Sequence, residues 1–134
     1  EHIGRVPELS DGVAAEKKLV FHGLKPYEET LNLIAAADCG VVFTSDEKFE
    51  STTKIFDYLS FDLDIVVVAP NDRAEGPIAN LGIPEGKIYW VKNEIGAIRN
   101  FLDKYQPSPK RPDRASKYSR AESTKTLTKL LEEL

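Results

Sequence analysis

The stretch Ile65-Val66-Val67-Val68-Ala69 decides the fold, because it is the clearest strand in the sequence. All of its residues are apolar, and all but the last are β-branched. An unbroken apolar run of this kind is typical of a strand that is covered on both faces, as in a parallel sheet. The stretch therefore predicts a parallel sheet with helices above and below it.

Apolar runs and helix-like stretches alternate on either side of this strand. Short apolar runs predict strands near 19–21, 39–43, 64–69 and 87–91. Helical spacing predicts helices from Pro26 to Asp38, and near 51–61, 74–81 and 94–105. Such alternation is the signature of a doubly wound α/β sheet. We therefore predict a Rossmann-like parallel sheet with helices on both faces.

The two ends of the sequence are organised differently from its middle. Residues 1–106 are expected to form the α/β domain, with a truncated N-terminal edge at which His2-Ile3-Gly4 has the look of the end of a strand. Residues 107–134 begin with prolines among charges, which is typical of a linker or a wrapping segment. A capping-box pattern from Ser119 and leucines at 127, 130, 131 and 134 then predict a closing amphipathic helix.

Composition excludes several classes of protein. The 134 residues suffice for one domain, and 41% hydrophobic and 30% charged residues are ordinary globular values. A net charge of −4, with the basic residues spread out, gives no reason to expect a nucleic-acid partner. No apolar stretch reaches the roughly 18 residues of a membrane span. The lone Cys39 fits the reducing cytoplasm, and the absence of Met at position 1 predicts a piece of a longer chain.

The candidate ligand site lies where strands of the predicted sheet end. Ligands of parallel α/β sheets bind at the carboxyl ends of strands, next to helix N-termini. Two loops qualify, residues 22–25 and 44–53, and the second is the better candidate because Ser51, Thr52 and Thr53 begin a helix there. Unpaired backbone N–H groups and hydroxyls in that position can hold a phosphate.

Lys54 and Asp57 extend this candidate site along the helix. Because Asp57 follows Lys54 by three residues, both lie on one helical face, opposite the apolar Ile55 and Leu59. A phosphate at the helix start and a carboxylate one turn deeper match a nucleoside diphosphate, with the diphosphate first and the ribose second. The alternative is an ordinary helix cap with a surface Lys–Asp pair, which contributes little to stability. Spacing alone leaves both interpretations open.

Other reactive residues give weaker signals. The histidines, His2 and His22, are too few and too far from other ligand types to predict zinc. The acids at 46, 47 and 50 do not follow a calcium motif, so we expect no metal. Cys39 is interpreted as a small core residue rather than as a nucleophile.

Four segments, taken together, resemble one enzyme family. They are Val20-Phe21-His22-Gly23, the segment 33–42, the run Thr53-Lys54-Ile55-Phe56-Asp57-Tyr58-Leu59-Ser60 with the apolar strand that follows it, and the tail 119–134. In this order and at this spacing they resemble the C-terminal half of the retaining, GT-B-fold glycosyltransferases of group 1 (family 4). The resemblance covers nearly the whole chain.

The resemblance implies an activity for the full-length protein. It implies transfer of a sugar from a nucleoside-diphosphate sugar to an acceptor held by an N-terminal domain outside this chain, with retained anomeric configuration and no required cofactor. Polysaccharide biosynthesis, in some members at the membrane surface, is a frequent setting of the family. The fragment alone is expected to bind the donor without transferring sugar. The binding residues implied are Gly23, Leu24, Ser51, Thr52, Thr53, Lys54 and Asp57.

The sequence departs from the family pattern at three places. Asp57 stands where the family has a ribose-binding Glu, and Phe49 stands where it has the first Glu of its motif, so that Glu47 or Glu50 would have to contact the sugar. The turn Asp62-Leu63-Asp64 replaces Gly-Lys-Pro. Two alternatives remain open. One is a nucleotide-sugar epimerase, which shares the same architecture. The other, which these departures keep open, is a non-enzymatic binding or assembly domain.

Overall fold

The computed structural model describes residues 20–45, 53–73 and 76–111. The chain divides into two compact units, residues 1–36 and residues 37–134, and each is described by itself. The predicted segments at 2–4 and 119–134 lie outside the described residues.

The first unit contains the helix α1, Tyr27–Ala36. The carbonyl of Pro26 accepts the Thr30 N–H at 3.0 Å, and the acidic Glu28 and Glu29 lie in the first turn, where the helix dipole favours them. The predicted helix is thus confirmed.

The strand predicted near 19–21 is not found in the described part of this unit. Val20 has no regular structure, Phe21 forms only an isolated bridge, and Leu19 lies outside the described residues. Gly23, at φ 67°, turns the chain directly afterwards. An apolar run this short is at the lower end of strand lengths and offers few positions for a ladder of hydrogen bonds.

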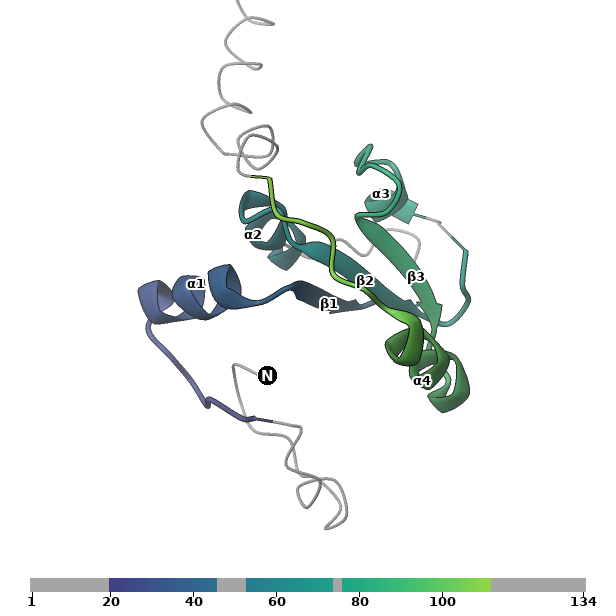
Figure 1. Ribbon diagram of the computed structural model, residues 1–134, viewed down its shortest axis with the longest axis horizontal. Coiled ribbons are helices and arrows are strands. Elements are labelled where there is room, and N and C mark those ends of the chain that lie inside the picture. Colours follow the sequence, from purple (N-terminus) through teal and green to yellow (C-terminus); the bar gives the residue numbers. More distant parts are fainter. Residues whose placement is uncertain (1–19, 46–52, 74–75, 112–134) are drawn as a thin grey trace, which may run out of the picture. The chain divides into compact units, whose positions relative to one another are not determined.

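The second unit contains a parallel β-sheet with helices packed against it (Figure 1). Its elements, in chain order, are β1 (Cys39–Phe43), α2 (Lys54–Ser60), β2 (Asp64–Ala69), α3 (Gly76–Ala79), β3 (Ile88–Lys92) and α4 (Ile95–Lys104). The three strands are all parallel and stand in the order β1-β2-β3. The register aligns Cys39 with Asp64 and Ile65 with Ile88. The predicted parallel sheet is confirmed for these three strands.

Strand β2 is the centre of this unit, and every one of its residues is buried. Because side chains alternate along a strand, Ile65, Val67 and Ala69 face one side of the sheet, while Val66 and Val68 face the other. The first set packs with residues of α2 and α3, and the second packs with α4. Helices therefore cover both faces, as the apolar run predicts.

Three element boundaries differ from the prediction. The helix expected near 51–61 begins at Lys54, with Thr53 as its N-cap. The helix expected at 74–81 is only Gly76–Ala79, because Asn80 and Leu81 donate to the carbonyls three residues before them and Gly82 then takes a φ of 62°. The last strand begins at Ile88 rather than at Lys87. Lys87 is buried just before this strand, and its side chain forms ion pairs with Asp62 and Asp64.

Helix α2 lies close against β1 at one glycine. A Cβ added to Gly40 would overlap the ring of Tyr58, and the Tyr58 hydroxyl lies 3.5 Å from the Val41 carbonyl oxygen. This contact, together with the fully buried Ile55, fixes the helix on the sheet.

Candidate functional site

The predicted donor-binding helix follows β1 directly in the parallel sheet. Beyond Phe43, the Thr44 N–H still donates to the Val68 carbonyl at 3.0 Å, so the sheet pairing continues to the start of the loop. Ile55 and Leu59 are buried and hold α2 on the sheet, whereas Lys54 is exposed and Asp57 is half-buried. The helix thus turns Lys54 and Asp57 away from the core, as their spacing predicts.

The amino-terminal end of α2, where the sequence predicts that a phosphate binds, is only partly described. Ser51 and Thr52 lie outside the described residues, as do Glu47, Phe49 and Glu50 of the same loop. Thr53 is exposed and helical in its backbone, and its side chain makes no capping hydrogen bond. Between Lys54 and Asp57, both described, there is no ion pair, so the surface pair of the alternative interpretation is not formed.

Gly23 and Leu24 belong to the first unit. Gly23 has the left-handed backbone that suits glycine, and Leu24 is 80% exposed. Because the units are described separately, these two residues are not placed relative to Lys54 and Asp57. The structure therefore brings together only the part of the predicted site that lies on α2.

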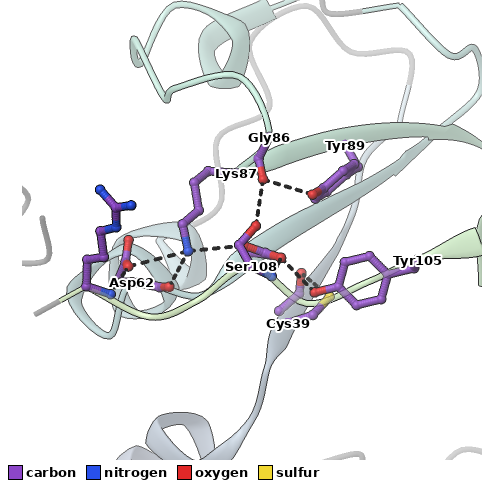
Figure 2. Close-up of polar contacts among 10 residues, drawn as sticks. Cys39, Asp62, Gly86, Lys87, Tyr89, Tyr105 and Ser108 are labelled. Atoms are coloured by element: carbon purple, nitrogen blue, oxygen red, sulfur yellow. Dashed lines mark hydrogen bonds and ion pairs between the residues drawn. The ribbon is translucent and has the colours of Figure 1, made fainter.

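A buried charged cluster that the sequence did not reveal lies at the amino-terminal edge of the sheet. It consists of Asp62, Asp64 and Lys87, which we call the carboxylate cluster (Figure 2). The Lys87 ammonium lies 3.1 Å from Asp64 Oδ1 and 3.4 Å from Asp62 Oδ2, and it also donates to the Asp62 carbonyl at 2.8 Å. None of the three residues is more than 7% exposed, so these charges are paired away from water.

Residues 105–111, which we call the strap, run from α4 toward the end of α2 and close over this cluster (Figures 1 and 2). The Tyr105 hydroxyl and the Ser108 N–H each donate to Asp64 Oδ2 at 2.8 Å, and the Arg111 N–H donates to Asp62 Oδ2 at 2.6 Å. The Ser108 hydroxyl donates to the Gly86 carbonyl at 3.0 Å. The wrapping interpretation of the proline-rich segment thus applies to its described part.

Burial and hydrogen bonding shift the pKa of several groups here. Burial alone would raise the pKa of Asp64, but the donors on Ser108 and Tyr105 and the Lys87 ammonium outweigh it and hold that pKa below its ordinary value. Burial and the hydrogen bond to Asp64 raise the pKa of Tyr105. Burial and the nearby Asp64 charge raise the pKa of Cys39 to about 11, so its thiol is protonated at neutral pH and is a poor nucleophile.

Two cavities lie on the α4 side of the sheet. One, of about 570 Å³, runs along β3 and α4 and is lined by both aromatic and charged residues, among them Phe101, Lys92 and Lys104. The other, of about 480 Å³, is mostly apolar and lies between β1 and α4, with Val41 and Phe43 on its wall. Neither of these two cavities is lined by residues of α2.

Comparison with known proteins gives no relative. No protein-family model, no curated protein and no solved structure matches the chain. Within the described residues, no helix is long and apolar enough to cross a membrane. The same part of the chain contains no group of three or more His, Cys, Asp or Glu residues that could hold a metal ion.

The carboxylate cluster had a weak signal in the sequence. Asp62 and Asp64 flank the start of a fully apolar strand, and Lys87 stands directly before the next strand. Charges at the ends of buried strands are often solvated, so this pattern does not predict burial. The donors on the strap lie more than 40 residues further along the chain, and nothing in the local pattern pairs them with these acids.

Proposed function

We propose that this chain is the donor-binding part of a GT-B-fold glycosyltransferase, which holds a nucleoside-diphosphate sugar on a Rossmann-like sheet. In the full enzyme, a second domain would hold the acceptor, and transfer would retain the anomeric configuration. The observation that carries the proposal is the position of α2, which follows β1 of a parallel sheet and turns Lys54 and Asp57 away from the core.

The chemistry of these two side chains suits a nucleoside diphosphate. A lysine in the first turn of a helix is unfavourable next to the positive end of the helix dipole unless an anion lies nearby. A bound diphosphate would supply that anion, and Asp57 would accept hydrogen bonds from the ribose hydroxyls. As the glycosidic bond breaks, negative charge grows on the diphosphate, and Lys54 together with the N–H groups at the start of α2 would stabilise it.

The turn before β2 also supports the resemblance. The family has glycine where this chain has Asp62, and Asp62 adopts a φ of 52°, the left-handed conformation that glycine favours. Aspartate is among the few other residues that tolerate this conformation. Asp62 and Asp64 also have a structural use in the carboxylate cluster. Their presence is therefore no sign of a degraded donor site.

Titration calorimetry with uridine and guanosine diphosphates tests the proposal. Lys54→Ala should weaken binding by about 1–3 kcal/mol, the range for a charge-assisted hydrogen bond, and high salt should reduce this effect. Asp57→Asn should cost less and should weaken the preference for ribose over 2′,3′-dideoxyribose nucleotides. Lys104→Ala and Asp103→Asn, which change exposed residues of α4, are matched controls that should bind like the wild type.

The other outcomes point to other functions. Nucleotide binding that is unchanged in both α2 variants would place the site elsewhere on the chain. Failure of the wild type to bind any nucleoside diphosphate would favour a non-enzymatic assembly domain. Conversion of an added nucleotide-sugar into its epimer would favour the epimerase.

A further inference from the structure

The carboxylate cluster lies at the amino-terminal edge of the sheet and takes no part in the proposed donor site. We infer that it is a clamp that holds the strap as a separable element, which can open while the sheet stays folded. The strap is bound by hydrogen bonds to a charged cluster, and it contributes no residue to the apolar clusters of the sheet.

Beyond Tyr105, whose ring packs against Tyr89 and Phe101, the strap is held by polar contacts. Its hydrogen bonds run from Tyr105, Ser108 and Arg111 to the two carboxylates and to the Gly86 carbonyl. Of the strap residues, only Tyr105 and Ser108 are half-buried, and the rest are exposed. Segments with little buried apolar surface open at a lower free energy than core strands do.

The apolar core does not need the strap. The cluster on the α2 side is built from β1, α2, β2 and α3, and the cluster on the α4 side is built from β2, β3 and α4. Neither cluster contains a residue from 105–111. Opening of the strap beyond Tyr105 would therefore remove no residue from either cluster.

The carboxylate cluster carries a net negative charge, and the strap donates hydrogen bonds to it. Two carboxylates face one ammonium group, which leaves one net negative charge among three buried residues. The N–H groups of Ser108 and Arg111 and the hydroxyl of Tyr105 point at this charge. Hydrogen bonds to an ionised group are stronger than those between two neutral groups. Three such donors therefore hold the strap in place, although it buries little apolar surface.

Prolines limit which residues can make these bonds. Pro107 and Pro109 have no N–H group and restrict the backbone on both sides of Ser108. The Ser108 amide is thereby presented to Asp64 by a stiff segment, and the Arg111 amide reaches Asp62 at the far end. The clamp thus fixes the path of the chain between Tyr105 and Arg111.

Hydrogen exchange of single amides in the full chain tests the inference. In the wild type, the amides of Ser108 and Arg111 should exchange more slowly than in a free peptide but faster than those of Val66 and Val67 in β2. Ser108→Asp places a third carboxylate against Asp64, and should speed exchange at Arg111 at least about tenfold while Val66 and Val67 change little. Tyr105→Phe removes one donor and should have a smaller effect of the same kind. Gln106→Asp adds the same charge at an exposed strap position and should leave the strap closed.

Several results would overturn the clamp. One is exchange at Ser108 and Arg111 that is as slow as at Val66 and Val67, since strap and sheet would then open only together. Another is free-peptide exchange of the strap in the wild type. A third is a Ser108→Asp variant that behaves like Gln106→Asp, or one that speeds exchange in β2 as much as in the strap.

Discussion

Asp64 is a carboxylate without exposed surface at the start of a fully apolar strand, and its partners come from distant parts of the chain. Lys87 precedes the neighbouring strand, and Tyr105 and Ser108 follow α4. Removing one partner of a buried ion pair costs more than the pair contributes, because the other charge stays buried alone. Asp64 is therefore a residue at which a small chemical change should have a large effect.

We expect Asp64→Asn to lower the free energy of unfolding by about 3 kcal/mol at pH 7, because Lys87 keeps its charge and loses one partner. The folded pKa of Asp64 lies below its ordinary value, so this stabilisation is present above the unfolded pKa of about 3.9 and is lost as the pH falls through the folded pKa. Urea unfolding at several pH values should therefore show the two proteins converging below about pH 4. Asp72→Asn, at an exposed position, is the control. If the difference in unfolding free energy between the wild type and Asp64→Asn did not change with pH, the ionised Asp64 carboxylate would not be its cause.

At the scale of single residues, the sequence predicted that Lys54 and Asp57 of α2 lie outside the core, but it did not predict the carboxylate cluster. Helical spacing alone separates Lys54 and Asp57 from Ile55 and Leu59, because side chains three and four residues apart share a face. The partners of Asp64 are fixed only by the tertiary fold. A local pattern cannot predict such a long-range pairing of charges.

At the scale of elements, α2 depends on its close approach to β1. We expect Gly40→Ala to cost about 1–3 kcal/mol, since the added methyl group would overlap the Tyr58 ring. In a Tyr58→Ala background the same change should cost much less, because the ring is gone. A double-mutant cycle of unfolding free energies measures this coupling. Equal costs in the two backgrounds would show that another contact positions the helix.

The order and type of the elements followed largely from hydrophobic periodicity. Strand β2 and helices α1 and α4 have long, regular patterns, and the structure contains them within one or two residues of the predicted ends. The prediction was weakest where a pattern was short. The apolar run near Phe21 makes only a bridge, and the helix near Ile78 ends early because Gly82 adopts a left-handed conformation.

At the scale of the whole sheet, its two faces are covered unequally along β1. Val42 is 3% exposed beneath α2, whereas its neighbour Phe43 is 68% exposed on the opposite face. Val42→Ala should therefore cost about 2 kcal/mol, and Phe43→Ala, although it removes more atoms, should cost less than about 1 kcal/mol. Chemical denaturation of the two variants checks this, and a larger loss for Phe43→Ala would mean that its face is covered in solution.

The aromatic residues of the second unit give its two faces separate optical signals. Trp90, the single tryptophan, packs against the core on the α2 side, so its fluorescence reports on that layer. Tyr89, Phe101 and Tyr105 form a group of rings with centroids 5.2–5.7 Å apart on the other side, and this group ends on the first strap residue. Such fixed rings contribute to the near-ultraviolet circular dichroism. If the strap opens first, the tyrosine bands of the dichroism should lose part of their intensity at a lower urea concentration than the tryptophan emission changes, and one sample can be read for both events.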